Sequence, residues 1–458
     1  MEKETIAAIS TPAGPGAIGV LRLSGAQAIQ IAAQCFHPLG PKTLRDYAPR
    51  TLVYGDLLDR CGQPIDRILC TYSKGPVSYT GEDTAEFHCH GSPMVLSLGL
   101  DALFACGARQ AGPGEFTRRA FLNGKLDLAQ AEAVGDLLEA KSREGARHAA
   151  GQLAGSLSRR IGEIYSGLVD LMAHFCAVLD YPDEDIDPFR SEELTASLSQ
   201  QEHALSQLLD SCRRGYQLTH GISCAIVGRP NAGKSSLLNA LAGYDRAIVT
   251  EIPGTTRDTV EVNVELAGLP FRLIDTAGLR DSGDPVERLG VARSRAAMEQ
   301  ADLILVLCDR SAPFTQEDRQ LLDLAVELAP AILVWSKSDL SPAPCISLLS
   351  LPDGLPAVEV SVKTGQGLSA LEGAVAALFP SQPAAPYGQL LTNQRQEDAA
   401  RRASTSIVRA REALEAGMTP DALLTDVEEA LAALGELTGQ SVREDITNRI
   451  FARFCVGK

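Results

Sequence analysis

The chain has 458 residues, which is enough for about three domains of ordinary size. Its 42 Lys and Arg residues stand against 58 Asp and Glu residues, and a formal net charge of −16 argues against a protein that grips nucleic acid unaided. No apolar run reaches the length of a membrane span, the start lacks the pattern of a signal peptide, and the 11 cysteines include no Cys-x-x-Cys pair, so we expect a protein of the reducing cytoplasm that does not enter a membrane.

The distribution of apolar residues divides the chain into four segments. Residues 1–118 carry short apolar runs between Gly and Pro turns, which predicts an α+β domain. Helical spacing is found over residues 119–215 and again over residues 381–458, whereas residues 216–380 alternate strands and helices in the α/β manner. We therefore expect an α/β domain inserted into one helical domain, whose two parts pack together.

The most informative motif begins at Gly228 and reads Gly-Arg-Pro-Asn-Ala-Gly-Lys-Ser. An apolar strand precedes it and a helix follows it, so its N–H groups and the helix N-terminus are expected to cradle phosphates. A chance Gly-rich turn is the alternative, which this context disfavours. Lys234 can reach the β and γ phosphates, and Ser235 can bind Mg²⁺. The predicted nucleotide-binding residues of this loop are Asn231, Ala232, Gly233, Lys234, Ser235 and Ser236.

Two further motifs predict the surroundings of the γ-phosphate. Asp275-Thr276-Ala277-Gly278 follows an apolar strand, where an acid suits a water-mediated Mg²⁺ contact. A switch loop is predicted between the two motifs, with Thr256 closing over Mg²⁺ and the γ-phosphate; a solvated turn is the alternative. The switch-loop residues are Thr250, Glu251, Ile252, Pro253, Gly254, Thr255 and Thr256.

The residues that would activate water are unusual. Leu279 and Arg280 follow the Asp-x-x-Gly turn, so the Gln that often orients the attacking water is missing. Glu287 is the nearest plausible carboxylate, although an acid at the start of a solvated helix is an equal alternative. The amide oxygen of Asn231 could help to coordinate a monovalent cation beside the phosphates.

Base choice is expected from two short motifs that follow strands. Ser336-Lys337-Ser338-Asp339 places a carboxylate where it can accept from guanine N1–H and the exocyclic amine, a donor pair that adenine lacks. Ser361-Val362-Lys363 fits the last base-contacting loop. Together the motifs resemble those of Ras-like GTPases of the translation-factor class. The first residue of the first base motif is usually Asn in these GTPases, and here it is Ser336. The shorter Ser336 is expected not to span both the base and the P-loop, which would weaken guanine binding by about 1 kcal/mol.

Further blocks of sequence lie in all the segments and carry a wider resemblance. They are Gly14–Gly16, Arg22–Gly25, Tyr79–Asp83 with Glu86, Pro113–Thr117, Ala120–Glu132, Gly254–Asp258, Asp275–Arg280 and the ending Cys455-Val-Gly-Lys458. In this order they resemble the MnmE (TrmE) family of tRNA-modification GTPases, over essentially the whole chain.

The resemblance implies an N-terminal domain that binds a tetrahydrofolate derivative, 5-formyl or methylene, and forms a homodimer. The family's folate positions fall on Arg22, Glu86, Lys125 and Lys458. For Arg22, Glu86 and Lys125, an ordinary surface charge is the alternative. Cations suit the glutamate carboxylates of folate, and an acid suits the amino groups of the pterin.

The resemblance also implies GTP hydrolysis that depends on K⁺. The K⁺ ligands fall on Asn231, Thr250, Ile252 and Thr255, and the catalytic glutamate falls on Glu287. The family acts with the flavoprotein MnmG (GidA), in a heterotetramer or larger complex, to add an aminomethyl or carboxymethylaminomethyl group to the wobble uridine of certain tRNAs. A GTP-dependent switch for ribosome assembly is the alternative, although the chain lacks its basic RNA-binding module. Pro253 departs from the family pattern and could shift the switch loop.

Two groups of residues leave alternatives open. Cys455 is either a catalytic thiol near the folate-type site or an unreactive thiol at a frayed helix end. His88 and His90 alternate about Cys89, so both side chains would share one face of a strand and could bind a metal. A strand edge near Glu86 is the favoured interpretation, because a second spaced pair of ligands is lacking.

Overall fold

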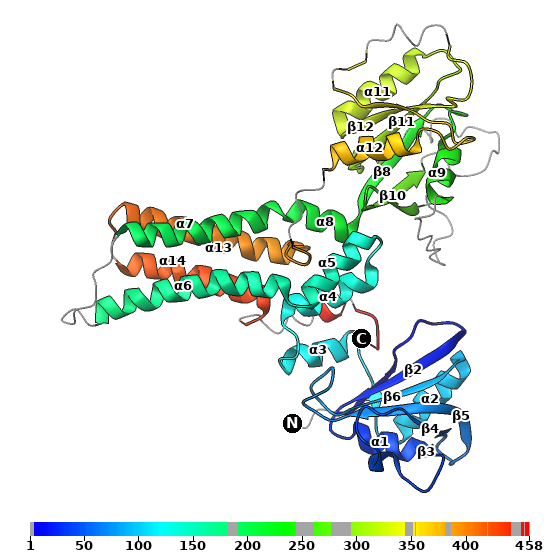
Figure 1. Ribbon diagram of the computed structural model, residues 1–458, viewed down its shortest axis with the longest axis vertical. Helices are drawn as coiled ribbons and strands as arrows, with labels where there is room; N and C mark the ends of the chain where they lie inside the picture. Colours follow the sequence, from blue (N-terminus) through cyan, green and yellow to red (C-terminus); the bar gives the residue numbers. More distant parts are fainter. Residues whose placement is uncertain are drawn as a thin grey trace. The chain divides into compact units, whose positions relative to one another are not determined.

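The computed structural model describes residues 4–180, 191–243, 261–275, 295–343, 351–352, 354–380, 386–418, 420–440, 450–452 and 454–457 (Figure 1). Its internal contacts divide the chain into two compact units. The first comprises Met1–Gly135, Ile161–Ile186 and Ala416–Lys458, and the second comprises Asp136–Arg160 and Asp187–Glu415. Each unit is described by itself.

A mixed sheet forms the N-terminal part of the first unit, and its described strands lie in the order β3-β4-β5-β6-β2-β1-β7. Neighbouring strands are antiparallel, except that β1 and β7 are parallel. The strands are β1 (Ile6–Ile9), β2 (Gly16–Ser24), β3 (Phe36–Pro38), β4 (Val53–Leu58), β5 (Pro64–Ser73), β6 (Thr84–Gly91) and β7 (Arg109–Gln110).

Side-chain alternation gives this sheet one apolar face and one mixed face. Leu21 and Leu23 of β2 and Phe87 of β6 are buried in a core with helices α1 (Ala28–Cys35) and α2 (Pro93–Ala105). The alternate positions Arg22 and Glu86 therefore lie on the opposite face, because successive strand residues point to opposite sides. A short 3₁₀ helix, η1 (Leu44–Asp46), borders the same core.

The end of the chain lies against the N-terminal part of the first unit. Phe451 packs on Phe121 with 6.3 Å between ring centroids. The Gly114 N–H donates to the Cys455 carbonyl at 3.2 Å, and the Ser10 hydroxyl donates to the Gly457 carbonyl at 2.9 Å. The described part of this tail is therefore held at several points. The further helices in or bordering this unit are α3 (Glu115–Leu122), α4 (Leu128–Glu139), α6 (Ser156–Asp180) and α14 (Pro420–Thr438).

The second unit contains an α/β sheet whose described strands lie in the order β13-β12-β11-β8-β10-β9. All neighbours are parallel except β9 and β10, which form an antiparallel pair. The strands β8, β11 and β12 are almost wholly buried apolar runs, as expected for parallel strands covered on both faces. The strands are β8 (Ile222–Gly228), β9 (Glu261–Leu266), β10 (Leu269–Asp275), β11 (Leu303–Asp309), β12 (Ala331–Ser336) and β13 (Ala357–Glu359).

Helices cover both faces of this sheet. Helices α9 (Lys234–Gly243) and α12 (Leu368–Leu378) share one core with the strands, and α11 (Gln316–Leu328) belongs to the other. Val334 contributes to the first core, whereas its neighbour Trp335 contributes to the second. The two faces of β12 therefore have different surroundings.

Helices that precede and follow the α/β sheet in sequence pack together in the second unit. They are α5 (Arg143–Leu153), α7 (Ser191–Asp210), α8 (Cys212–His220) and α13 (Gln394–Glu415). Helix α7 runs beside α13 (Figure 1), where Arg411 pairs with Glu202 at 2.9 Å. The Gln152 amide also donates to the Leu390 carbonyl at 2.6 Å. No helix among the described residues is long and apolar enough to cross a membrane.

Candidate guanine-nucleotide site and N-terminal ligand site

The P-loop motif occupies the turn between β8 and α9, with the predicted strand before it and helix after it. Gly228 ends β8 at a φ of +155°, and a Cβ atom there would collide with the Leu307 carbonyl. Gly233 has a φ of +97°, a conformation that favours glycine. Asn231 adopts a φ of +63°, which Asn tolerates better than most residues. The glycines are thus required by the loop's shape.

Lys234 lies inside the loop and is 9% exposed. Its Nζ donates to the Gly228 carbonyl at 2.7 Å and to the Arg229 carbonyl at 2.8 Å. The ammonium group therefore sits at the centre of the turn, where the loop's N–H groups and the start of α9 would meet a phosphate. Ser235 and Ser236 lie on the first turn of α9 and are exposed.

Arg229 holds the P-loop to α11, a role that the sequence analysis did not anticipate. Its Nε donates to the Asp318 Oδ1 at 2.8 Å, and Asp318 is 2% exposed. The other oxygen of Asp318 accepts from the backbone N–H and hydroxyl of Thr315, which caps α11. Thr315 and Asp318 form the capping-box spacing, which is visible in the sequence. The spacing does not reveal the contact with Arg229.

A cavity of about 400 Å³ opens beside the P-loop at the carboxyl ends of the parallel strands. This volume lies within the range of small-molecule sites, and ligands of open α/β sheets bind at this edge. The cavity is lined by Gly233, Ser236, Leu237, Leu307, Val334, Ser336, Lys337, Asp339, Leu340, Val360, Val362 and Lys363. Residues of both predicted base motifs therefore meet the P-loop in one cavity.

Asp339 is oriented by Ser361, the first residue of the second base motif. The Ser361 hydroxyl donates to the Asp339 Oδ1 at 2.7 Å. This hydrogen bond lowers the pKa of Asp339, so the group stays an ionised acceptor. Lys337 has a φ of +56° and pairs through Nζ with the Asp309 Oδ2 at 2.6 Å. The described base motifs thus carry their own hydrogen-bond network.

Ser336 contacts the P-loop, and its expected failure to span to the base as well stays a prediction. Its hydroxyl lies 2.6 Å from the Ala232 carbonyl, so this short side chain does reach the P-loop. The reason is that β12 ends directly beside the loop, with Ser336 buried at 6% exposure. The neighbouring Trp335 points away from the cavity and packs on Phe314, with 5.9 Å between ring centroids.

A second candidate site lies on the mixed face of the N-terminal sheet. Arg22 and Glu86 stand directly opposite in the β2–β6 register, and the Arg22 Nε donates to the Glu86 Oε1 at 2.8 Å. The rings of Tyr79 and Phe116 each lie 5.8 Å from the Arg22 guanidinium. The Lys125 side chain runs beside Gly81, in the same loop as Tyr79. Three of the four predicted folate positions thus surround one loop.

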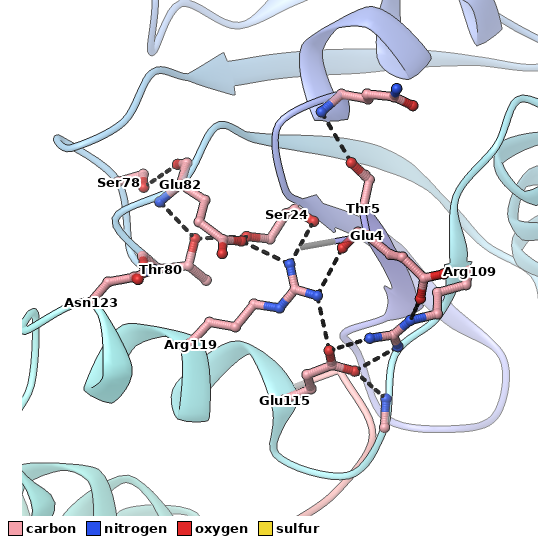
Figure 2. A network of polar contacts seen from close by, with 12 residues as sticks. Glu4, Thr5, Ser24, Ser78, Thr80, Glu82, Arg109, Glu115, Arg119 and Asn123 are labelled. Carbon is pink, nitrogen blue, oxygen red and sulfur yellow. Dashed lines mark hydrogen bonds and ion pairs between the residues drawn. The ribbon is translucent and has the colours of Figure 1, made fainter. Parts of the chain in front are cut away.

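A partly buried ion-pair network fixes that loop (Figure 2). Arg119 is 4% exposed and donates to the Glu82 Oε2 and the Glu115 Oε1, each at 2.9 Å. Arg109 donates to both oxygens of Glu115 at 2.8 and 2.7 Å. Burial acts to raise the pKa of Glu115, but hydrogen bonds from Arg109, the Gly112 N–H and Arg119 outweigh it and hold the pKa at about 2. Sequence analysis did not predict this network.

The expectation of a strand edge for the histidines of β6 is wrong, because β6 lies inside the sheet, between β5 and β2. His90 pairs through Nδ1 with the Asp66 Oδ1 at 2.7 Å, and His88 Nε2 lies 3.6 Å from the Glu86 Oε2. Within the described ranges there is no cluster of three side chains suited to a metal ion.

Comparison with known proteins matches both parts of the chain. A model of the MnmE helical domain matches residues 128–455, and a model of the N-terminus of GTP-binding protein TrmE matches residues 5–125. The tRNA modification GTPase MnmE of Symbiobacterium thermophilum is 44% identical over 459 residues, which cover 100% of both chains. The chain belongs to the MnmE family.

Other members of the family are similar over the same length. The tRNA modification GTPase MnmE of Roseiflexus sp. (strain RS-1) is 44% identical and covers 99% of each chain, and that of Chloroflexus aurantiacus is 43% identical, covering 99% of this chain and 100% of the relative. A solved structure of Era from Aquifex aeolicus is 26% identical, covers 40% of this chain and 66% of its own, and has a TM-score of 0.29. A TM-score this low supports no argument about the fold of this chain.

Several predicted site residues fall outside the described part of the MnmE-family chain. They are Thr250–Thr256, Thr276–Gly278, Glu287 and Lys458, whereas Asp275 ends β10. Of the predicted metal ligands, Ser235 and Asn231 are described, and both are exposed at the P-loop. Cys455 is also exposed, and its own carbonyl accepts from the Gly114 N–H.

Proposed function

We propose that this protein uses GTP bound in the cavity beside the P-loop to drive the modification of tRNA. That it is a GTP hydrolase follows from its membership of a family whose members are named tRNA modification GTPases. The observation that carries the proposal is the meeting of the P-loop residues Gly233 and Ser236 with Ser336 and Asp339 around one cavity of about 400 Å³. Phosphate-binding and base-reading groups thus lie at one sheet edge.

The G domain is proposed to span residues 216–380, inserted into a helical domain made of residues 119–215 and 381–458. Contacts between α7 and α13, and between Gln152 and the Leu390 carbonyl, support this division because they join the segments on either side of the insertion. Residues 1–118 form the proposed folate-binding and dimerisation domain.

The cations of the proposed mechanism require oxygen ligands. Ser235 offers a hydroxyl on the first turn of α9, and Asn231 offers an amide oxygen in the loop; both are exposed and suit hard cations. Mg²⁺ would be held by Ser235 and Thr256, and K⁺ by Asn231, Thr250, Ile252 and Thr255. When bound, the ions offset phosphate charge. Lys234 orients the phosphates, and Glu287 is proposed to position the attacking water.

The N-terminal site suits a ligand that carries both charge and an aromatic ring. Arg22 and Glu86 are 23% and 32% exposed, and the rings of Tyr79 and Phe116 border the guanidinium. A tetrahydrofolate derivative, 5-formyl or methylene, combines carboxylates with a pterin ring, and Lys125 and Lys458 would meet its carboxylates. It would supply a one-carbon unit, and Cys455 is proposed as a catalytic thiol.

The full reaction is proposed to take place in the cytoplasm, in a complex of the homodimer with the flavoprotein MnmG, on the wobble uridine of certain tRNAs. The net charge of −16 supports a partner that supplies much of the grip on tRNA.

GTP hydrolysis by the purified chain in KCl and in NaCl at equal ionic strength tests this proposal. We expect faster hydrolysis in KCl alone, because the cation site at Asn231 would select K⁺. With the flavoprotein, a folate donor and tRNA present, the modified nucleoside is expected only when GTP is hydrolysed. Equal hydrolysis rates in both salts would contradict the proposed K⁺ site. Modification of tRNA without GTP would contradict the proposed coupling of GTP hydrolysis to modification.

A further inference from the structure

The first base motif begins with Ser336 in place of the usual Asn, and the Ser336 hydroxyl hydrogen is already donated to a backbone carbonyl. Ser336 is 6% exposed, and its hydroxyl lies 2.6 Å from the Ala232 carbonyl and 3.3 Å from the Cys308 carbonyl. A hydroxyl carries one hydrogen, and both neighbours are acceptors, so the nearer carbonyl takes it. Ser336 therefore has no hydrogen to give to a base.

The effect on base recognition follows from how guanine would lie against Asp339. Asp339, fixed by Ser361, would accept from guanine N1–H and the exocyclic amine. Around the ring from that edge come O6 and then N7, both acceptors. O6 is next to the edge that Asp339 would hold, and N7 is further round the ring. Ser336 and Gly233 of the P-loop line the same cavity as Asp339, so a base held there with its phosphates on the P-loop would turn N7 toward Ser336. N7 is the base atom that needs a donor at this place.

We propose that Ser336 ties β12 to the P-loop and leaves guanine N7 unread, so that the site accepts guanine nucleotides without regard to N7. An Asn at this position carries two amide hydrogens and can serve a P-loop carbonyl and N7 together. This inference rests on the proposed guanine-nucleotide site.

The test compares GDP with 7-deaza-GDP, which replaces N7 by C–H and leaves the Watson–Crick edge intact. Calorimetric titration of the full-length protein is expected to give equal Kd values for the two nucleotides. Ser336→Asn is expected to bind GDP about fivefold more tightly, the effect of one hydrogen bond, while its Kd for 7-deaza-GDP stays unchanged. Ser336→Ala is the matched control: both Kd values rise by the same factor, because it loses only the tie to the P-loop.

Two results would overturn the inference. A wild-type protein that binds 7-deaza-GDP about fivefold more weakly than GDP has another donor on N7. A folded Ser336→Asn variant that still binds both nucleotides equally shows that position 336 does not face N7. If Ser336→Asn does not fold, the wild-type and Ser336→Ala ratios decide the question. Failure of the wild-type protein to bind GDP at all would instead overturn the guanine-nucleotide site itself.

Discussion

Lys234 and Arg22 each place a positive charge in a candidate ligand site, and the two are held in different ways. Lys234 donates to carbonyls six and five residues before it, inside its own loop. Arg22 donates to Glu86, which is 64 residues away, next to a loop fixed by Arg119. The first arrangement is built by local sequence and the second by tertiary packing, so they should respond differently to mutation.

The largest effect is expected from Lys234→Ala. Losing two charge-assisted hydrogen bonds to the phosphates should lower kcat/KM for GTP by on the order of 1,000-fold, while folate binding is unaffected. Steady-state hydrolysis measures the first quantity and equilibrium dialysis of 5-formyltetrahydrofolate the second. Lys125→Ala is the matched control, with normal hydrolysis. A Lys234→Ala protein within tenfold of wild type would show that this loop does not hold the phosphates.

Arg119→Ala should lower the stability of the protein, because the N-terminal site depends on tertiary packing. Removing a 4% exposed cation leaves Glu82 and Glu115 without this buried partner, and the free energy of unfolding should fall by about 3 kcal/mol. Urea denaturation of the full chain measures this loss. Arg67→Ala removes the exposed pair with Asp56 and should cost less than about 1 kcal/mol. Similar losses in both variants would contradict the role given to the network.

A smaller effect is expected from Arg22→Ala. Because the cation is already paired with Glu86, a folate ligand gains only the difference between two partners, and its Kd should rise by about tenfold. GTP hydrolysis should not change. Unaltered folate binding in a folded Arg22→Ala protein would show that the folate ligand does not bind at the Arg22–Glu86 pair.

The last expected effect is a pH dependence of stability. The pKa of Glu115 is lowered from 4.5 to about 2 in the folded protein, so its contribution is complete above pH 4.5 and is lost as the pH falls toward 2. Glu115→Gln should flatten the dependence of unfolding free energy on pH in this window. A slope equal to that of the wild-type protein would contradict the pKa assigned to Glu115.

The contrast between the two sites also explains what the sequence could predict. The strands around the P-loop and the base motifs were predicted because apolar runs end directly at Gly228 and before the motif at Ser336. The pairs Arg229–Asp318 and Arg119–Glu82 could not be predicted, since their partners lie 89 and 37 residues apart. The contact of Ser336 with the P-loop could not be predicted either, because the spacing of β12 and the loop is a tertiary property.

The most direct test of the account is the nucleotide preference of Asp339→Asn. Replacing the carboxylate by an amide removes an acceptor for the guanine amine and supplies a donor for the carbonyl that xanthine has at the same place. Titration of both nucleotides should show weaker binding of GDP and stronger binding of XDP, each by at least about tenfold. An unchanged preference for GDP in the folded variant would show that Asp339 does not read the base, and the cavity beside the P-loop would no longer be its site.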